Sequence, residues 1–242
     1  MRAFLLVFII SITLFVNCNF VNAQLQKPEN YSKFDSRLLH FGVQLGLNSN
    51  NFLLVTQPSL FSKYNYTSIV TEGLPGAQVG MVVSLKCFTP IVRLRFVPTF
   101  SFIERVIKYQ VFSKDVDDKI ESIEKRINSS NLDFPLMLQL RTMRSTNFDA
   151  YCLGGIQFTY DLQSMADKTQ NFVDPFIKLK KQNLMLQAGG GIEFFAEYFK
   201  FGIELKYSYG FQDVLIQDAT IFSSPLRYLK NNSWIFSITF EG

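Results

Sequence analysis

Hydrophobic and polar residues alternate strictly from Phe199 to Gln212. Phenylalanine, isoleucine, leucine and tyrosine occupy the odd-numbered positions, and polar residues or glycine occupy the even-numbered ones. Successive side chains of a β-strand point to opposite faces, so this segment predicts a strand with one apolar face and one face carrying Lys200, Glu204 and Lys206. A soluble sheet can show the same pattern, so the number of such segments and their connections must decide where the strand belongs.

Further segments alternate in the same way and bring the number of predicted strands to eight. They cover residues 39–48, 77–87, 92–102, 132–141, 150–162, 184–194, 199–212 and 233–241, with an extension of the third strand to Phe112 left open. Gly189 to Gly191 lie inside the sixth strand, where glycine favours sharp barrel curvature over a phosphate-binding loop.

The connections between these strands alternate in length, and the long ones run from Ser49 to Leu74, Ser113 to Ser130, Ser164 to Lys181 and Asp213 to Leu229. Outer-membrane barrels have an even number of antiparallel strands, short periplasmic turns and long external loops. The predicted fold class is therefore all-β, an eight-stranded antiparallel up-and-down transmembrane β-barrel with both termini in the periplasm. A soluble sandwich, the alternative, gives no reason for connections of regularly alternating length.

One long connection breaks the period-two pattern. Between Lys114 and Ile127, the apolar residues Val116, Ile120 and Ile123 recur at helical spacing among acidic ones. This spacing predicts a short amphipathic helix within a loop, and a solvated charged run without fixed structure is the alternative.

The first residues have the pattern of an export signal. Arg2 precedes an apolar run of about 14 residues, and Val21-Asn22-Ala23 resembles a cleavage site, so residues 1–23 are predicted to be a cleaved signal peptide. The run is shorter than the roughly 20 residues of a membrane-spanning helix, although a membrane anchor and lipoprotein processing at Cys18 remain alternatives. The mature chain then divides into a periplasmic tail at 24–37 and an outer-membrane barrel domain at 38–242.

The net charge and the cysteines limit which partners and crosslinks are expected. The formal net charge of +4 at pH 7 falls to +3 without Arg2, which is too small to indicate a nucleic-acid partner. Cys87 and Cys152 remain after cleavage, each at an apolar position of a different predicted strand. We expect them to be small lipid-facing residues, with a disulfide as the alternative.

The inward faces of the predicted strands carry charges of both signs. An eight-stranded barrel is just wide enough for its own side chains, so these residues are expected to form an ion-paired structural network that fills the lumen. A functional polar lumen is the alternative. The network is predicted to consist of Arg93, Arg95, Arg141, Glu193, Glu204 and Lys206.

No group of residues indicates catalysis. His40 is the only histidine, and it lies at the predicted periplasmic end of the first strand, where a lumen or rim hydrogen bond is expected instead. A hydrolase needs a nucleophile, a base and an orienting acid within hydrogen-bond reach. Metal-ligand clusters and phosphate-binding loops are not recognisable either. We therefore expect neither an enzyme nor a bound cofactor, and we infer no small-molecule substrate.

Four stretches carry a family resemblance that spans nearly the whole mature chain. These are His40-Phe41-Gly42 with Leu45-Gly46-Leu47-Asn48, Pro75 to Met81, Leu132 to Leu136, and Tyr198 to Val214. They resemble the PorT family, small outer-membrane barrels associated with the type IX protein secretion system. Many outer-membrane barrels end on an aromatic residue, whereas this chain adds Glu241 and Gly242 after Phe240.

The resemblance implies a non-catalytic accessory component that supports protein export by the type IX system, with the lipid bilayer and other secretion components as partners. The architecture alone supports a second hypothesis, a stand-alone small barrel with a structural, adhesive or ligand-binding role. The expected surfaces for partners are the long loops and the periplasmic tail, because loops carry binding while the scaffold positions them.

Overall fold

The computed structural model describes residues 30–31, 34–61, 65–87, 89, 91–112, 120–166, 168–169, 175–218 and 220–242. The predicted signal peptide and most of the predicted tail lie outside these residues. No helix among the described residues is long and apolar enough to cross a membrane.

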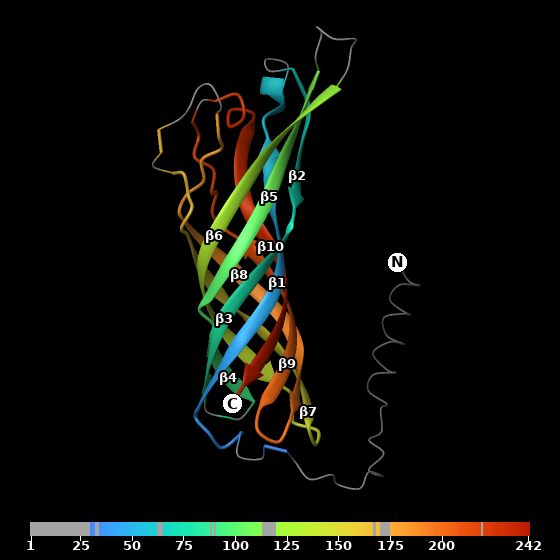
Figure 1. The fold of residues 1–242 in the computed structure, drawn as a ribbon, viewed down its shortest axis with the longest axis vertical. Helices are drawn as coiled ribbons and strands as arrows, with labels where there is room; N and C mark the ends of the chain where they lie inside the picture. Colours follow the sequence, from blue (N-terminus) through green and yellow to red (C-terminus); the bar gives the residue numbers. More distant parts are fainter. Residues whose placement is uncertain are drawn as a thin grey trace, which may run out of the picture.

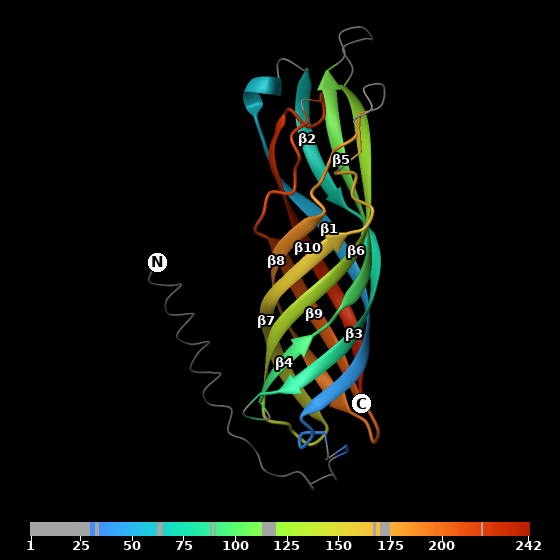
Figure 2. The same cartoon turned by 90° about the vertical axis from the view of Figure 1, so that its left-hand side faces the viewer.

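Ten strands form one antiparallel sheet, with a short 3₁₀ helix, η1 (Pro58–Leu60), after the first strand. The strands are β1 (Leu39–Thr56), β2 (Tyr66–Gly73), β3 (Pro75–Lys86), β4 (Val92–Phe96), β5 (Thr99–Phe112), β6 (Ile120–Arg141), β7 (Phe148–Asp161), β8 (Gln182–Phe195), β9 (Lys200–Gly210) and β10 (Leu226–Glu241). Together they form a tall, tilted cylinder (Figures 1 and 2).

The sheet closes on β1, which pairs with β10 on one side and with β3 on the other. Leu74 alone separates β2 from β3, and only Val97 and Pro98 separate β4 from β5. Each of these pairs follows one continuous path, so the ring has the eight members that the sequence predicted. Proline lacks the N–H that a strand ladder needs, which explains the break at Pro98.

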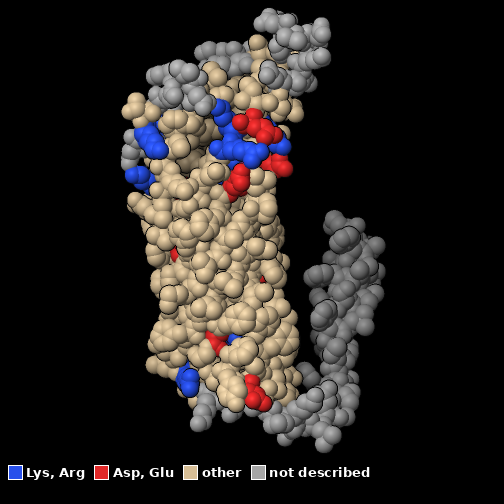
Figure 3. All heavy atoms as spheres, viewed as in Figure 1, with Lys and Arg blue, Asp and Glu red and all other residues tan. Residues whose placement is uncertain are grey.

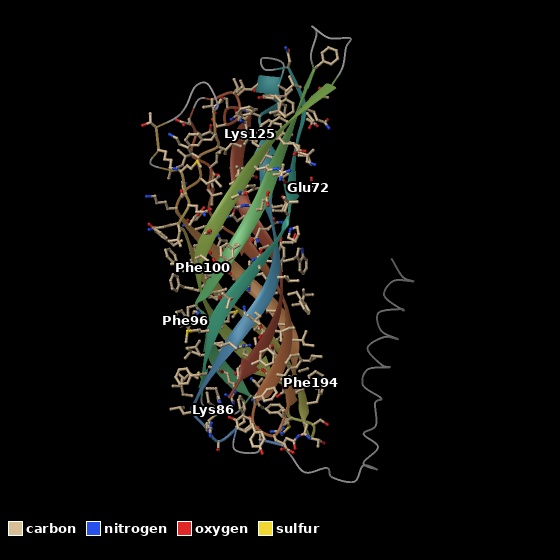
Figure 4. All side chains as sticks on the ribbon, in the orientation of Figure 1. Glu72, Lys86, Phe96, Phe100, Lys125 and Phe194 are labelled. Atoms are coloured by element: carbon tan, nitrogen blue, oxygen red, sulfur yellow. The ribbon has the colours of Figure 1, made fainter. Side chains whose placement is uncertain are left out.

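The predicted alternation of faces along the barrel wall is confirmed. Leu205 is 53% exposed on the outside, whereas its neighbour Lys206 is 2% exposed inside the lumen. Phe96, Phe100 and Phe194 likewise lie on the wall (Figure 4). The middle of the wall is almost free of charged side chains in the view of Figure 3. An apolar outer band around a polar interior is the pattern of a barrel in lipid.

The short connections lie at one end of the barrel. They join β3 to β4, β6 to β7 and β8 to β9, and Leu39 and the C-terminus lie at the same end (Figure 1). We call it the periplasmic end, because short turns of outer-membrane barrels face the periplasm. The opposite end is extended by a cap, which we define as the described residues of 50–56, 65–73, 104–112, 120–130, 162–181 and 211–229.

In the cap, the polarity of the strand faces is reversed. On β5, the outward residues change from Phe100 and Phe102 to Glu104 and Lys108. The inward ones change from Ser101 and the buried Arg105 to Ile107 and Tyr109. Outward apolar residues suit lipid, and outward charged residues suit water. The outer boundary of the bilayer therefore crosses β5 between Phe102 and Glu104.

This reversal explains what the sequence predictions missed. The predicted helix is wrong from Ile120 to Ile127, which belongs to β6; residues 113–119 lie outside the described residues. The loop expected from Ser49 to Leu74 contains the end of β1 and all of β2, and β10 begins at Leu226. β2 and the cap ends of β6 and β10 have apolar residues inside and charged residues such as Glu72, Arg126 and Arg227 outside, so a search for lipid-facing apolar positions passes over them. The cap end of β1 has no charged residue.

Cys87 and Cys152, the two cysteines among the described residues, are both free. Cys152 lies on the exposed face of β7, as predicted for a lipid-facing residue, whereas Cys87 lies just beyond the end of β3.

Leu205→Arg should destabilise the barrel by about 2–4 kcal/mol, because it places a charge near mid-bilayer. Val70 is a matched control, since it is also 53% exposed but lies on β2 in the cap. Val70→Arg faces water and should cost less than about 1 kcal/mol. Urea unfolding in lipid vesicles measures both values, and equal costs would contradict the proposed boundary.

Candidate functional site

The periplasmic half of the lumen is filled by charged side chains, which we call the lumen charge network. Five cations and five anions contribute to it, so the formal charges balance. The network comprises Arg93, Arg95, Arg141, Lys200 and Lys206 together with Asp35, Asp149, Glu193, Glu204 and Glu241. The strands supply nine of these residues, and Asp35 comes from the segment before β1.

Glu204 on β9 is the centre of one half of the network. Its carboxylate lies 2.5 Å from Arg95 Nη1 and 2.7 Å from Lys206 Nζ. It also accepts hydrogen bonds from the Tyr151 hydroxyl at 2.7 Å and from Ser237 Oγ at 3.3 Å. A buried carboxylate is tolerated when its oxygens are paired and hydrogen-bonded in this way.

Glu193 and Glu241 are the shared carboxylates in the other half of the lumen charge network. Lys200 Nζ lies 2.7 Å from Glu193 and 3.0 Å from Glu241, and Arg95 reaches Glu241 at 3.1 Å. Arg141 lies 3.4 Å from Glu193 and also contacts Asp149. Strands that are far apart in the sequence are thus joined through shared carboxylates.

Gly191 makes room for one of these contacts. A Cβ atom at this position would lie 2.6 Å from the hydroxyl oxygen of Tyr151, which donates to Glu204. The glycine that the sequence associated with barrel curvature therefore also permits a close approach of an aromatic side chain.

The segment before β1 closes the periplasmic mouth of the lumen. Phe34 is fully buried, and its ring stacks on His40 with 3.7 Å between centroids. Asp35 Oδ1 lies 3.0 Å from Arg141 and 3.5 Å from Arg93. His40, for which the sequence predicts a lumen or rim hydrogen bond, packs in an aromatic stack with Phe34.

The lumen contains two small cavities of about 20 and 10 Å³. Amide and hydroxyl side chains line them together with Asp133, and Lys206 of the network lines the smaller one. The larger has room for about one water molecule. Cavities of this size are too small to form a passage for a solute.

The interior of the cap is a hydrophobic core. It includes Phe52, Ile107, Tyr109 and Leu229, together with residues from the connections at 162–181 and 211–229. The Tyr109 hydroxyl donates to the carbonyl of Phe222 at 2.9 Å, and burial raises the pKa of this hydroxyl. This packing resembles the core of a soluble domain.

The outside of the cap carries ion pairs. Lys108 Nζ lies 2.5 Å from Glu72 and 3.5 Å from Glu124, and Arg126 lies 3.3 Å from Glu104. The hydrogen bond and charge of Glu72 raise the pKa of Lys108. Charged side chains are seen gathered at this level in Figure 3, and Glu72 and Lys125 are labelled in Figure 4.

A half-open groove of about 440 Å³ runs along the cap between β6 and the segment that follows β7. Lys125, Arg126 and Lys168 line it together with apolar residues such as Met165 and Phe176. The groove can accommodate a ligand with an anionic group and an apolar part. Among the described residues, no cluster of histidine, cysteine and acidic side chains is suited to a metal ion.

The structure brings all six residues of the predicted lumen set to the periplasmic half. Arg95 pairs with Glu204 and Arg141 with Glu193, whereas Arg93 has Asp35 as its acidic neighbour. The sequence prediction missed Asp35, Asp149, Lys200 and Glu241. The alternation along β9 and β10 places Lys200 and Glu241 on the inward face, so the sequence pattern could have identified these two.

Comparisons with known proteins identify a family. Residues 22–215 match the family model described as outer membrane protein beta-barrel domain. No functionally curated protein matches the chain.

Crystal structures similar to the chain include the following three. OprG of Pseudomonas aeruginosa shares 14% identity over 90% of this chain and 99% of its own, with a TM-score of 0.48. Neisserial surface protein A shares 10% identity over 82% of this chain and 95% of its own, with a TM-score of 0.41. Ail of Yersinia pestis, in complex with the heparin analogue sucrose octasulfate, shares 11% identity over 85% of this chain and 100% of its own, with a TM-score of 0.38.

Glu204→Gln should cost about 3–5 kcal/mol of unfolding free energy, because Arg95 and Lys206 would lose their shared buried carboxylate. Glu104→Gln, which removes the exposed partner of Arg126, should cost no more than about 1 kcal/mol. Denaturant unfolding of the reconstituted barrel, followed by the gel shift between folded and unfolded forms, measures both. A Glu204→Gln barrel as stable as Glu104→Gln would show that the buried pairs contribute little.

Proposed function

This chain belongs to the outer-membrane protein β-barrel domain family, and we propose that it acts there without catalysis as an accessory component of type IX protein export. In this proposal it is embedded in the outer-membrane bilayer and works through contacts that its surfaces make with other secretion components.

The filled lumen supports a role at the surface. Ion pairs occupy the periplasmic half, and a hydrophobic core occupies the cap. A barrel of this size has room for its own side chains and none for a folded protein. Any part in export must therefore come from binding, and the surfaces outside the bilayer are available for it.

The assignment to the type IX system is supported by the resemblance to the PorT family. The resembling stretches are the ones that build the wall, including those around Gly42 in β1 and Gly80 in β3, and the stretch from Tyr198 to Val214 that contains β9. The cap offers partners a rigid surface, because β5 and β6 carry its charged residues above the bilayer on paired strands.

One observation favours the second candidate function, a stand-alone barrel that binds a ligand. The cap groove of about 440 Å³ combines lysine and arginine side chains with apolar ones, as an anionic amphiphile would require. The two candidates predict different consequences of losing the gene.

Deleting the gene should stop secretion of type IX substrates and leave them in the periplasm, as measured by fractionation and immunoblotting. Wild-type protein supplied in trans should restore export. A Lys108→Glu/Arg126→Glu variant should assemble normally, shown by faster gel migration before boiling, yet restore export poorly because the charged cap surface is altered. Export at the wild-type level in the deletion strain would exclude the secretion role and leave the ligand-binding barrel.

A further inference from the structure

The mouth segment, which we define as residues 30–31 and 34–38, occupies a formed pocket at the periplasmic end. Figures 1 and 2 show the described part of this segment below the barrel, at the end where β1 begins. The segment makes no strand pairing of its own. Within the segment, the backbone N–H of Phe34 donates to Tyr31 at 2.9 Å and that of Arg37 donates to Phe34 at 3.3 Å. The barrel holds its two ends, through a bond from Lys86 to Leu38 at 2.8 Å and through the bonds that Asn30 makes with Asn147 and Arg144.

The pocket is lined by aromatic rings and cations. Phe34 stacks on His40 and meets Phe195 edge to face, with 5.6 Å between ring centroids. The Arg93 guanidinium lies 4.6 Å from the Phe34 ring centroid, and Lys200 Nζ lies 4.7 Å from it. Cations at this distance are attracted by the face of an aromatic ring. The pocket therefore selects an aromatic side chain over an aliphatic one.

The same pocket requires a carboxylate. Arg93 is fully buried, and none of its three guanidinium nitrogens has a hydrogen-bond partner among the described residues. Asp35, 3.5 Å away, is the nearest acidic side chain to Arg93 and also pairs with Arg141. Glu241 and Glu193 act on Arg93 from farther away. Lys86 Nζ adds a hydrogen bond to the Asp35 carbonyl at 3.0 Å.

Without the mouth segment, Arg93 loses its nearest carboxylate, and Glu241 and Glu193 are the acidic groups that still act on it. An incoming carboxylate would take over the ion pair with Arg93 and so compete with Asp35 for this position. Asp35 is partly open to solvent, with its side chain 33% exposed, so a replacement can approach from the periplasm.

We propose that the periplasmic mouth is a binding site for an aromatic ring joined to a carboxylate, and that Phe34 and Asp35 are its exchangeable resident occupant. The external ligand is an aromatic-acidic segment of a periplasmic partner, which would take the place of the mouth segment. This site lies at the opposite end of the barrel from the cap and does not depend on the secretion role.

The test uses the full-length protein with the pocket emptied by Phe34→Ala/Asp35→Asn. The tethered segment competes at an effective concentration on the order of millimolar, so a free probe binds best when the native side chains are removed. The probe is acetyl-Phe-Asp-amide, and the matched controls are acetyl-Phe-Asn-amide and acetyl-Ala-Asp-amide. Phenylacetate is added separately to distinguish a free aromatic acid from a peptide.

The variant should unfold at a lower temperature than the wild type in the heat-shift gel assay. At ten times its dissociation constant, acetyl-Phe-Asp-amide should raise the ratio of folded to unfolded variant about tenfold, while both control peptides leave it unchanged. Rescue by phenylacetate as well would assign the site to aromatic carboxylates in general. Loss of stability without rescue by either aromatic acid would overturn the proposal and make Phe34 and Asp35 a permanent part of the core.

A second measurement applies if the variant does not fold. In the wild-type protein, excess peptide carrying benzoylphenylalanine before aspartate should crosslink, on illumination, to the strand ends that carry His40 and Phe195. Unlabelled acetyl-Phe-Asp-amide should reduce this crosslinking, and acetyl-Phe-Asn-amide should not. Crosslinks at unrelated positions, or the absence of competition, would overturn the proposal.

Discussion

The closure of the sheet on β1 is the constraint on which the rest of the structure depends. Hydrocarbon offers no hydrogen bonds, so a strand with an unpaired edge cannot remain in a bilayer. β1 meets this condition by pairing with β10 from Gly42 to Thr56 and with β3 from Leu39 to Ser49. A ring of eight members leaves a narrow lumen, and the inward side chains must therefore fill it.

The side chains that fill the interior change from polar within the bilayer to apolar in the cap, because the surroundings of the barrel change from lipid to water. Within the bilayer, the outside must be apolar, so polar and charged residues are left to the inside and have to pair there. In the cap, water surrounds the same strands, and the usual arrangement of an apolar interior and charged exterior returns, as Ile107 and Lys108 illustrate. One barrel thus combines a membrane protein with a soluble β-structure.

This change of surroundings also limits what the sequence can predict. Period two gives the strand and the parity of each residue, and β9 was predicted from Phe199 to Gln212 against an observed Lys200–Gly210. Parity does not tell whether the outer face meets lipid or water, so Ile120 to Ile127 were assigned to a helix. Ion pairs are harder to predict than strands. Asp35 contacts Arg93 and Arg141 because of the path that the segment before β1 takes, and the sequence of this polar tail has no periodic pattern that would predict the path.

Glu241 links the last strand of the ring to two other strands. It is the final residue of β10, and its carboxylate bridges Lys200 of β9 and Arg95 of β4. Before β10 is in place, both cations lack this neighbour, and the ring is also open at β1. Pairing of β10 therefore supplies both the missing hydrogen bonds of β1 and the carboxylate of Glu241, so a barrel that lacks β10 is unfavourable on both counts.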